Sequence, residues 1–509
     1  MLQNCMMHWQ TVCALQQASS TDVLPRHERL LTRQVGLSWT ASLTVMSLRG
    51  RSTCVAARDI LVALRDIGLL EFVRLKDGDQ SMSQRKPLPP SLYADTARAA
   101  IATPPLDGSR QVSVVIVGGG FTGLSTALHL AENGVDVMVL EAHEPGWGAS
   151  GRNGGQVNPG LKHDPDVIEA HFGAELGRRM IEMSWNAPNV VFDLVRRHQI
   201  QCEARQSGTI KAAYTNAMAK GVRESYEQGA RRGMPVELLE RDAMREATGT
   251  QRYLSALIDR RGGHLNPLSY ARGLVQAATQ AGAKVHGGTP VLSVARQSSK
   301  WSVTTSTGTV TADKIVLATN GYTDDLWPKL KRTIVPVYSG IVATEPIPEA
   351  VARDIFPARA SLYEMGQVTV YYRLDAQNRV LMGGRCRQSP VSHPDQMAFL
   401  KRYALKLWPQ LAPFKFSHGW NGQLGVTIDH YPHIHEPADG VLVCLGYNGR
   451  GVAMSTTMGP ELARRVMGGK AADINMPITD LKSIPFQGLW RTGVAARITY
   501  GRIRDYLQV

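Results

Sequence analysis

Residues 112–158 read VSVVIVGGGFTGLSTALHLAENGVDVMVLEAHEPGWGASGRNGGQVN, and this stretch decides the fold class of the chain. The β-branched run Val114–Val117 predicts a buried parallel strand. It ends in a G-x-G-x-x-G turn, after which Leu124–Asn133 has helical spacing and Val135–Leu140 predicts a second strand. Glu141 follows directly, 23 positions after the first glycine of the motif. This order of strand, glycine turn, helix, strand and acid predicts a Rossmann-like, dinucleotide-binding α/β unit.

Each residue of the motif has its own expected role. Gly118 allows the tight turn, Gly120 lets the backbone approach a diphosphate, and Gly123 lets the helix pack closely on the strand. The free N–H groups and the positive dipole end of the helix then hold the diphosphate. Glu141 accepts hydrogen bonds from the ribose hydroxyls of an adenosine. The alternative, that these glycines serve only a loop, does not explain both strands and the acid.

The segment after Glu141 separates a flavin from a nicotinamide. A nicotinamide enzyme usually continues into another helix and strand of the same sheet, whereas this chain enters GWGASGRNGG at 146–155. A segment with so many glycines does not form a packed helix, but its backbone can lie against a flat ligand. The sequence therefore favours a flavin.

Together, VVIVGGGFTGLSTALHL, VLEA and GASGRNGGQVNPG resemble the FAD-dependent amine oxidoreductases of the D-amino-acid oxidase superfamily, and most of all those of γ-glutamylputrescine-oxidoreductase type. The resemblance extends from about Met82 to the C-terminus. Some relatives tether the flavin through a cysteine in the region matching 423–428 or a histidine near 149–152. Neither region has such a residue here, so the resemblance implies noncovalent FAD.

Two later segments are consistent with a flavin domain. Asn266 and Gly282 are suited to begin and end a helix, and short strands are predicted after it up to Ala318. VLVCLGYNGRG at 441–451 repeats a strand, a glycine turn and a helix start, which the resemblance places at the pyrimidine edge of the flavin. An ordinary exposed glycine turn stays an alternative there. The cofactor-binding candidates are Gly118, Gly120, Gly123, Glu141, Ser150, Gly151, Arg152, Asn153, Gly154, Val291 (facing the adenine), Thr319 (near the diphosphate), Gly446, Asn448, Gly449, Arg450 and Gly451.

The expected architecture is a discontinuous FAD-binding domain with an inserted antiparallel-sheet substrate domain. The FAD-binding domain takes 111–160, 263–330 and 436–475, and the substrate domain takes 161–262 and 331–435. The first insertion is largely helical by pattern, and the second predicts antiparallel strands, including a hairpin over 368–382. Residues 1–110 form an N-terminal extension and lead-in, and residues 476–509 form a C-terminal tail.

The resemblance also implies the reaction. An amine or amino acid loses hydride from the carbon beside nitrogen to flavin N5, and the resulting imine is hydrolysed; γ-glutamylputrescine-like compounds are the suggested substrates. Because the flavin performs the redox step, no catalytic side chain is assigned. Oxygen or another electron acceptor completes the cycle. The alternatives are a flavin-linked amine or D-amino-acid dehydrogenase that reduces a quinone, a tRNA-modifying flavoprotein, and a flavin-binding protein without enzymatic activity.

Four residues are candidates for substrate binding: Arg373, Tyr372, His430 and Trp420. Arg373 on the predicted hairpin has the planar guanidinium that suits a carboxylate, although a solvated strand arginine is at least as common. Trp420 is equally consistent with a core residue. The histidines at 430, 433 and 435 come with no carboxylate or cysteine set, so we expect no metal site.

Charge, hydropathy and cysteine content indicate which kinds of partner and location we expect. The 509 residues include 57 Lys and Arg against 43 Asp and Glu, a net charge of +14, but the basic residues are dispersed and no RNA-binding module is recognisable. We therefore expect a small-molecule substrate and no nucleic acid. The uncharged run 111–131 contains three consecutive glycines, so we expect no membrane span. Six scattered cysteines without a C-x-x-C favour a reducing, cytoplasmic location.

Residues 1–81 do not share the resemblance, and two interpretations stay open. They are either upstream sequence included by an early start codon, absent from the mature protein, or a small helical extension over residues 56–75.

Overall fold

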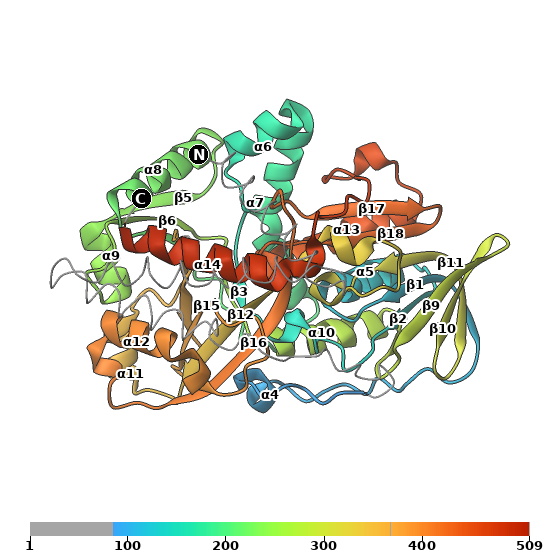
Figure 1. Cartoon of the computed structure of the whole chain (residues 1–509), viewed down its shortest axis with the longest axis horizontal. Helices are drawn as coiled ribbons and strands as arrows, with labels where there is room; N and C mark the ends of the chain where they lie inside the picture. Colours follow the sequence, from blue (N-terminus) through green and yellow to red (C-terminus); the bar gives the residue numbers. More distant parts are fainter. Residues whose placement is uncertain (1–84, 367, 508–509) are drawn as a thin grey trace, which may run out of the picture. The chain divides into compact units, whose positions relative to one another are not determined.

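The central sheet of the protein is built around β1 (Arg110–Val117). A computed structural model describes residues 85–366 and 368–507, all within one unit, Val73–Val509 (Figure 1). The expectations for residues 1–81 lie outside the described residues. The sheet has eight strands, with the order β17-β18-β11-β1-β2-β8 and a β9–β10 hairpin beside β11. The other strands are β2 (Val137–Leu140), β8 (Lys284–His286), β9 (Val291–Gln297), β10 (Lys300–Thr305), β11 (Thr309–Leu317), β17 (His433–Ala438) and β18 (Val441–Leu445).

The middle of this sheet is parallel and covered on both faces. Strands β18, β11, β1, β2 and β8 all pair in parallel. Successive side chains of β1 enter different cores: Val114 and Ile116 pack with the helical layer, and Val115 and Val117 pack with β9 and β10. The helices α5 (Phe121–Glu132), α10 (Pro267–Gln280) and α13 (Gly451–Val466) pack together in that helical layer. Burial on both faces explains why these strands read as continuous apolar runs.

The local predictions for this region are confirmed. Strand, turn, helix and strand occur in the expected order over 110–140. In α10 the Asn266 side chain accepts a hydrogen bond from the Ser269 N–H, and Gly282 follows the helix with φ of 107°. A short two-stranded sheet, β3 (Gln156–Val157) with β7 (Gly263–His264), lies outside the two large sheets.

The second large sheet draws strands from both insertions. Its order is β16-β12-β15-β14-β13-β4-β6-β5. The strands are β4 (Thr209–Ala213), β5 (Val236–Glu240), β6 (Ser255–Asp259), β12 (Val335–Thr344), β13 (Ser361–Glu364), β14 (Tyr371–Leu374), β15 (Val380–Arg385) and β16 (Phe416–Val426). The expected hairpin is present as β14 and β15. Two details correct the sequence analysis: the first insertion contributes three strands besides its helices, and β4 pairs with β13 in parallel, so the sheet is mixed.

Helices cover one face of the second sheet. Its apolar side chains pack with α11 (Glu349–Ile355) and α12 (Ala398–Leu407), in one core that includes Trp408 and Phe356. The remaining helices are α4 (Leu92–Thr96), α6 (Pro165–Phe172), α7 (Ala174–Arg197), α8 (Asn216–Arg231), α9 (Arg241–Thr248) and α14 (Trp490–Leu507). The last of these forms within the expected C-terminal tail and contacts β12 (Figure 1).

Candidate functional site

The turn between β1 and α5 leaves no room for side chains. Gly118 has φ of 109°, and a Cβ there would lie 2.8 Å from the carbonyl oxygen of Ala318. A Cβ at Gly123 would overlap the carbonyl oxygen of Gly118. The first position thus needs glycine for its backbone conformation, and the second needs it for close packing of the helix on the turn. Both roles match those expected from the sequence.

Glu141 lies at the end of β2 beside this turn. Its carboxylate accepts hydrogen bonds from the N–H of Gly119 at 2.7 Å and from the N–H of His143 at 2.9 Å. Burial raises the pKa of Glu141, and the backbone hydrogen bonds oppose that shift. The carboxylate is therefore held against the glycine turn, where its remaining lone pairs can accept from ribose hydroxyls.

Two helices that begin at this site lack a side-chain cap. Gly120 precedes α5 and Arg450 precedes α13, and neither residue caps its helix with its own side chain. Neither helix has an acid in its first turn, although the Ser150 hydroxyl accepts from one N–H of α5. By contrast, α8 and α10 are capped by Thr215 and Asn266. Uncapped N–H groups at a helix N-terminus favour an anion. FAD carries a diphosphate and a flavin ring that becomes anionic on reduction, so the two helix starts fit this cofactor.

The glycine-rich segment after Glu141 packs between the two sheets. The Ser150 hydroxyl accepts from the Phe121 N–H at 3.0 Å, so it joins the segment to the first turn of α5. The Asn153 side chain bonds the backbone of its own turn, and the Gly151 Cα packs near the Gly146 carbonyl. The Arg152 guanidinium binds the Tyr322 hydroxyl and stacks over Trp147. These hydrogen bonds and ring contacts fix the backbone conformation of the glycine-rich segment.

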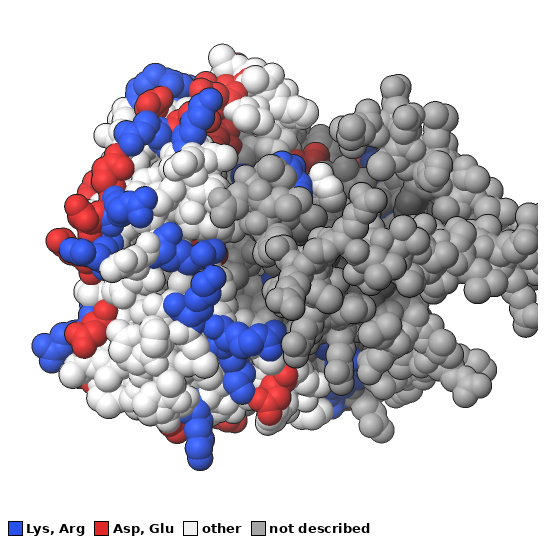
Figure 2. Space-filling view, turned by 60° about the vertical axis from the view of Figure 1, so that its left-hand side comes forward, with Lys and Arg blue, Asp and Glu red and all other residues white. Residues whose placement is uncertain are grey.

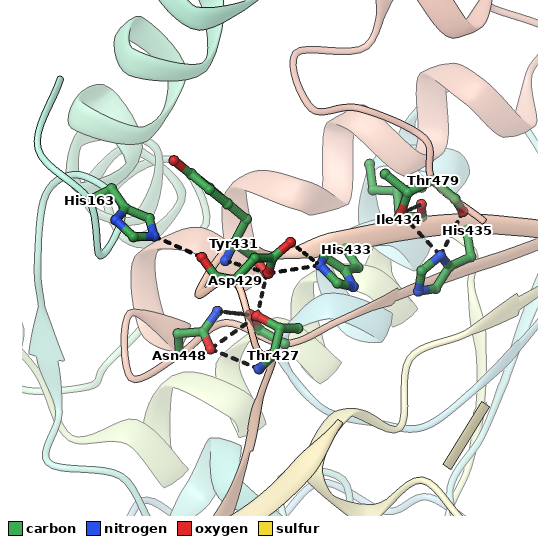
Figure 3. Close-up of polar contacts among 10 residues, drawn as sticks. His163, Thr427, Asp429, Tyr431, His433, Ile434, His435, Asn448 and Thr479 are labelled. Carbon is green, nitrogen blue, oxygen red and sulfur yellow. Dashed lines mark hydrogen bonds and ion pairs between the residues drawn. The ribbon is translucent and has the colours of Figure 1, made fainter. Parts of the chain in front are cut away.

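A second set of contacts shapes the turn before α13 (Figure 3). The Asn448 Oδ1 accepts from the Thr427 N–H at 3.0 Å, and Asn448 has φ of 53°. The Gly446 N–H donates to the Asn320 Oδ1 at 3.0 Å, which connects this turn to the one after β11. A Cβ at Gly449 would meet no atom within 4 Å, so open space borders this turn. Asn320 was not among the predicted residues, although it stands next to Thr319.

Thr319 and Val291 lie at the ends of strands of the first sheet. The Thr319 hydroxyl bonds the Thr323 hydroxyl at 2.7 Å just after β11. Val291 begins β9 and is buried with Val117 and Leu140. Both lie on the sheet that carries the glycine turn, and no contact of either residue assigns it to adenine or diphosphate.

His433 and His435 bind separate partners (Figure 3). His433 pairs with Asp429 at 3.0 Å, whereas His435 Nδ1 bonds the Thr479 carbonyl at 2.7 Å. His430 lies at the surface with φ of 60°, and partial desolvation of its ring together with nearby Lys162 lowers its pKa. His163 donates to the Asp429 carbonyl at 2.7 Å. In the described part of the chain, no three His, Cys, Asp or Glu side chains are arranged to hold a metal ion.

The adjacent tyrosines of β14 face opposite sides of the second sheet. Tyr372 is 1% exposed and packs against Phe356 and Trp408 in the core under α11 and α12. Tyr371 is half-buried and its ring lies against Gly154 of the glycine-rich segment. Because successive strand residues alternate between faces, Tyr371 and not Tyr372 borders the site. This corrects the substrate-binding assignment of Tyr372.

Arg373 and Trp420 serve as supports of the glycine-rich segment. Arg373 is 3% exposed; its guanidinium donates to the carbonyls of Gly154 and Leu265 and to the Tyr93 hydroxyl. Trp420 is fully buried and donates through Nε1 to the Arg152 carbonyl at 3.0 Å. These buried contacts do not favour Arg373 as a carboxylate ligand, and they give Trp420 a core position under the segment.

Three residues that the sequence analysis did not single out border the same space. Tyr363 and Arg385 lie on the face of the second sheet that also carries Tyr371, and Lys162 lies in the loop before α6. Arg450 connects these elements: it donates to the Tyr363 hydroxyl at 2.9 Å and to the Pro159 carbonyl at 3.3 Å. Strand pairing reveals Tyr363 and Arg385, since it determines which side chains share a face, whereas Lys162 lies in a loop and has no such signal.

Comparison with known proteins identifies the family. The family model described as FAD-dependent oxidoreductase (DAO) matches residues 113–465. The γ-glutamylputrescine oxidoreductase of Escherichia coli (strain K12) is 33% identical over 424 residues, which are 82% of this chain and 99% of that protein. The probable oxidoreductase OrdL of Haemophilus influenzae is 31% identical and covers 74% of this chain and 88% of its own.

Solved structures share the fold at lower identity. A glycine oxidase from Geobacillus kaustophilus superposes with a TM-score of 0.60 at 22% identity, over 71% of this chain and 96% of its own. In the described residues no helix has the length and apolar character of a membrane span. The chain belongs to the FAD-dependent oxidoreductase family, and FAD is its cofactor.

Proposed function

We propose that this enzyme oxidises the C–N bond of an amine of the γ-glutamylputrescine kind. The observation that carries the proposal is the 33% identity that extends over 99% of a γ-glutamylputrescine oxidoreductase. Within a family that includes oxidases of other amino compounds, similarity along the whole length supports a shared substrate class. The uncapped helix starts, Glu141 and the glycine-rich segment support the cofactor half of the proposal.

The chain's own residues would hold FAD in two places. Gly118, Gly120, Gly123 and Glu141 would bind the adenosine diphosphate half, with the first N–H groups of α5. Residues 150–154 and 446–451 would lie against the flavin, with the N-terminus of α13 stabilising negative charge on its reduced ring. Val291 and Thr319 complete this assignment at the ends of β9 and β11.

When bound, the flavin supplies two-electron oxidation, taking a hydride from the carbon beside nitrogen and passing the electrons to oxygen or another acceptor. The protein then has to bind the amine in its neutral form, orient its C–H bond and keep bulk water away. Tyr371 on the sheet face and His430 in the exposed loop are its nearest candidates for these tasks. Water hydrolyses the imine product, so no nucleophilic side chain is required.

Two further properties belong to the proposal. FAD is bound noncovalently, because neither 149–152 nor 423–428 contains a cysteine or histidine. The enzyme works in a reducing compartment such as the cytoplasm, a location supported by Cys202 and Cys444, which are buried thiols outside any disulfide. Acid precipitation of the holoenzyme should leave the yellow flavin in the supernatant; colour in the pellet would mean a covalent bond.

The substrate class can be tested by anaerobic reduction of the bound flavin. A panel of γ-glutamylputrescine, putrescine, glycine and D-alanine is mixed with holoenzyme, and loss of flavin absorbance is followed. We expect γ-glutamylputrescine to bleach the flavin fastest. Bleaching by none of these compounds, with FAD still bound, would refute amine oxidation. If an amine does bleach the flavin, peroxide release in air separates an oxidase from a dehydrogenase. A dehydrogenase reduces dyes or quinones but gives little peroxide.

A further inference from the structure

One face of the second sheet carries a row of polar side chains toward the glycine-rich segment. Strand pairing sets Tyr363 opposite Tyr371, and Tyr371 opposite Gly383. Arg385 lies two residues beyond Gly383 on β15, so its side chain is on the same face. Tyr371 contacts Gly154 from this face. The row therefore borders the space in which the amine must bind.

Arg385 has no partner among the described residues. No hydrogen bond or ion pair joins its guanidinium to any of them, although the side chain is half-buried and burial lowers its pKa. A guanidinium has five N–H donors, and withdrawing them from water without acceptors is costly. Arg373, on the neighbouring strand and the same face, instead donates to three protein oxygens. An acceptor from outside the described chain would satisfy Arg385.

Lys162 is a second cation, and it forms no ion pair with an acid in the described part of the chain. Lys162 is exposed, and its pKa is lowered to about 8, first by partial desolvation of its ammonium group and then by Arg450, Arg385 and Lys211. Asp164 acts on this pKa in the opposite direction, but Asp164 is already paired with Lys211 at 3.0 Å.

The loop that carries Lys162 is fixed at the same place as the sheet face. Arg450 joins Pro159 of this loop to Tyr363 of the row, and His163 binds the Asp429 carbonyl. Lys162 and Arg385 therefore border one space from two sides, the loop and the sheet. This space has an excess of positive charge.

We propose that Arg385 and Lys162 bind a carboxylate at the far end of the substrate, so that the enzyme selects acylated, carboxylate-bearing amines over free diamines. The inference rests on the proposed amine oxidation and names its substrate class. Arg385 offers two parallel N–H donors to the carboxylate, and Lys162 adds a point charge. The same positive charge disfavours a second ammonium group, so free putrescine, a dication at neutral pH, binds poorly. The face seen in Figure 2 carries both Lys and Arg and Asp and Glu side chains, so it is not uniformly basic.

The test compares two synthetic diamines that differ in one carboxylate. N-succinylputrescine carries it and N-acetylputrescine does not, while the reactive amine is the same. For Arg385→Gln and Lys162→Met we expect kcat/KM for the succinyl compound to fall at least about tenfold, with less than about a threefold change for the acetyl compound. Arg223→Gln, which removes an exposed ion pair with Glu240, is the control that leaves both values unchanged. Equal losses on both substrates, or none, would overturn the inference.

A binding measurement separates this inference from the proposed function. Glutarate, a dicarboxylate without an amine, is titrated into oxidised holoenzyme by calorimetry. We expect binding to the wild type and at least about a tenfold weaker Kd in Arg385→Gln, whose yellow colour and melting temperature report retained folding. If glutarate binds in this way while no amine bleaches the flavin, the carboxylate site stands and amine oxidation fails. If amines bleach the flavin but Arg385→Gln binds glutarate as tightly as the wild type does, amine oxidation stands and the carboxylate site fails.

Discussion

The two large sheets contribute to the site in different ways. In the first sheet, β1 buries Val114 and Ile116 on one face and Val115 and Val117 on the other, so only the strand ends and the backbone of their turns reach the site. In the second sheet, β14 buries Tyr372 under α12 but turns Tyr371 toward the glycine-rich segment. In the proposed function, the first sheet would therefore bind its ligand through backbone N–H groups, and the second would bind its ligand through side chains. Substitutions should affect the two halves by different mechanisms.

The largest effect is expected at the backbone half, from Gly120→Val. A Cβ at this position would lie 3.0 Å from the Ser150 Oγ, and the two further methyl groups of valine would occupy the turn against which a diphosphate binds. We expect a colourless protein with FAD affinity reduced at least about a hundredfold, equivalent to about 3 kcal/mol. Gly493→Ala, where a Cβ meets no atom within 4 Å, should stay yellow. Full flavin content in the valine variant would remove Gly120 from the cofactor site.

Arg373→Met tests the support that joins the two halves. The substitution leaves the carbonyls of Gly154 and Leu265 without their donor in a buried position. We expect the free energy of unfolding to fall by about 2–4 kcal/mol, measured by urea denaturation. Arg260→Met removes an exposed ion pair with Glu237 and should cost less than about 1 kcal/mol. If Arg373→Met kept full stability and lost only carboxylate-bearing substrates, Arg373 would be a substrate ligand after all.

Acid should lower the free energy of unfolding through His264, which lies near Arg373. Burial lowers the pKa of His264 to about 3, and the nearby Arg373 acts in the same direction. An unfolded histidine has a pKa of about 6.5, so between about pH 6.5 and about pH 3 the unfolded chain binds the extra proton and stability falls as pH falls. From about pH 7 to about pH 5 this one group should remove about 2 kcal/mol.

His264→Gln should show a smaller loss of unfolding free energy over the same pH interval. His393→Gln, at an exposed histidine, should lose as much as the wild type. Identical losses in the His264 variant and the wild type would show that His264 does not remain neutral in the folded protein.

The smallest effect is expected from removing single hydroxyls on the two faces of β14. Tyr371→Phe removes the hydroxyl that bonds the Ser339 hydroxyl at 3.1 Å beside the site. We expect a change of about fivefold in KM for the amine, equivalent to about 1 kcal/mol. Tyr372→Phe changes a buried hydroxyl on the opposite face and should leave KM unaltered. A larger kinetic effect at Tyr372 would reverse the assignment of the two faces.

The fold of the first sheet and its glycine turn could be predicted because their signals are local in the sequence. The glycine turn, its flanking strands and Glu141 lie within a few tens of residues, and Asn266 and Gly282 mark the ends of α10 as expected. The substrate half could not be predicted to the same depth. Tyr371, Tyr372 and Arg373 form one short polar-aromatic run, and only pairing with distant strands decides which of them faces the site. Arg385 and Lys162 approach one space from elements more than two hundred residues apart, a distance that no local pattern bridges.

The parallel pairing of β4 with β13 has a consequence for how the protein is made. Thr209 pairs with Ser361 across this junction, so β13 has to be synthesised before β4 can gain this second neighbour beside β6. Closing so long a loop slows folding, because the entropy of the intervening chain is lost before the contacts form. The first sheet also cannot be completed early in synthesis, since β18 and α13 come after residue 440. On the ribosome, neither half of the site can therefore be completed until most of the chain has emerged, and the nascent chain acquires its flavin only near the end of synthesis.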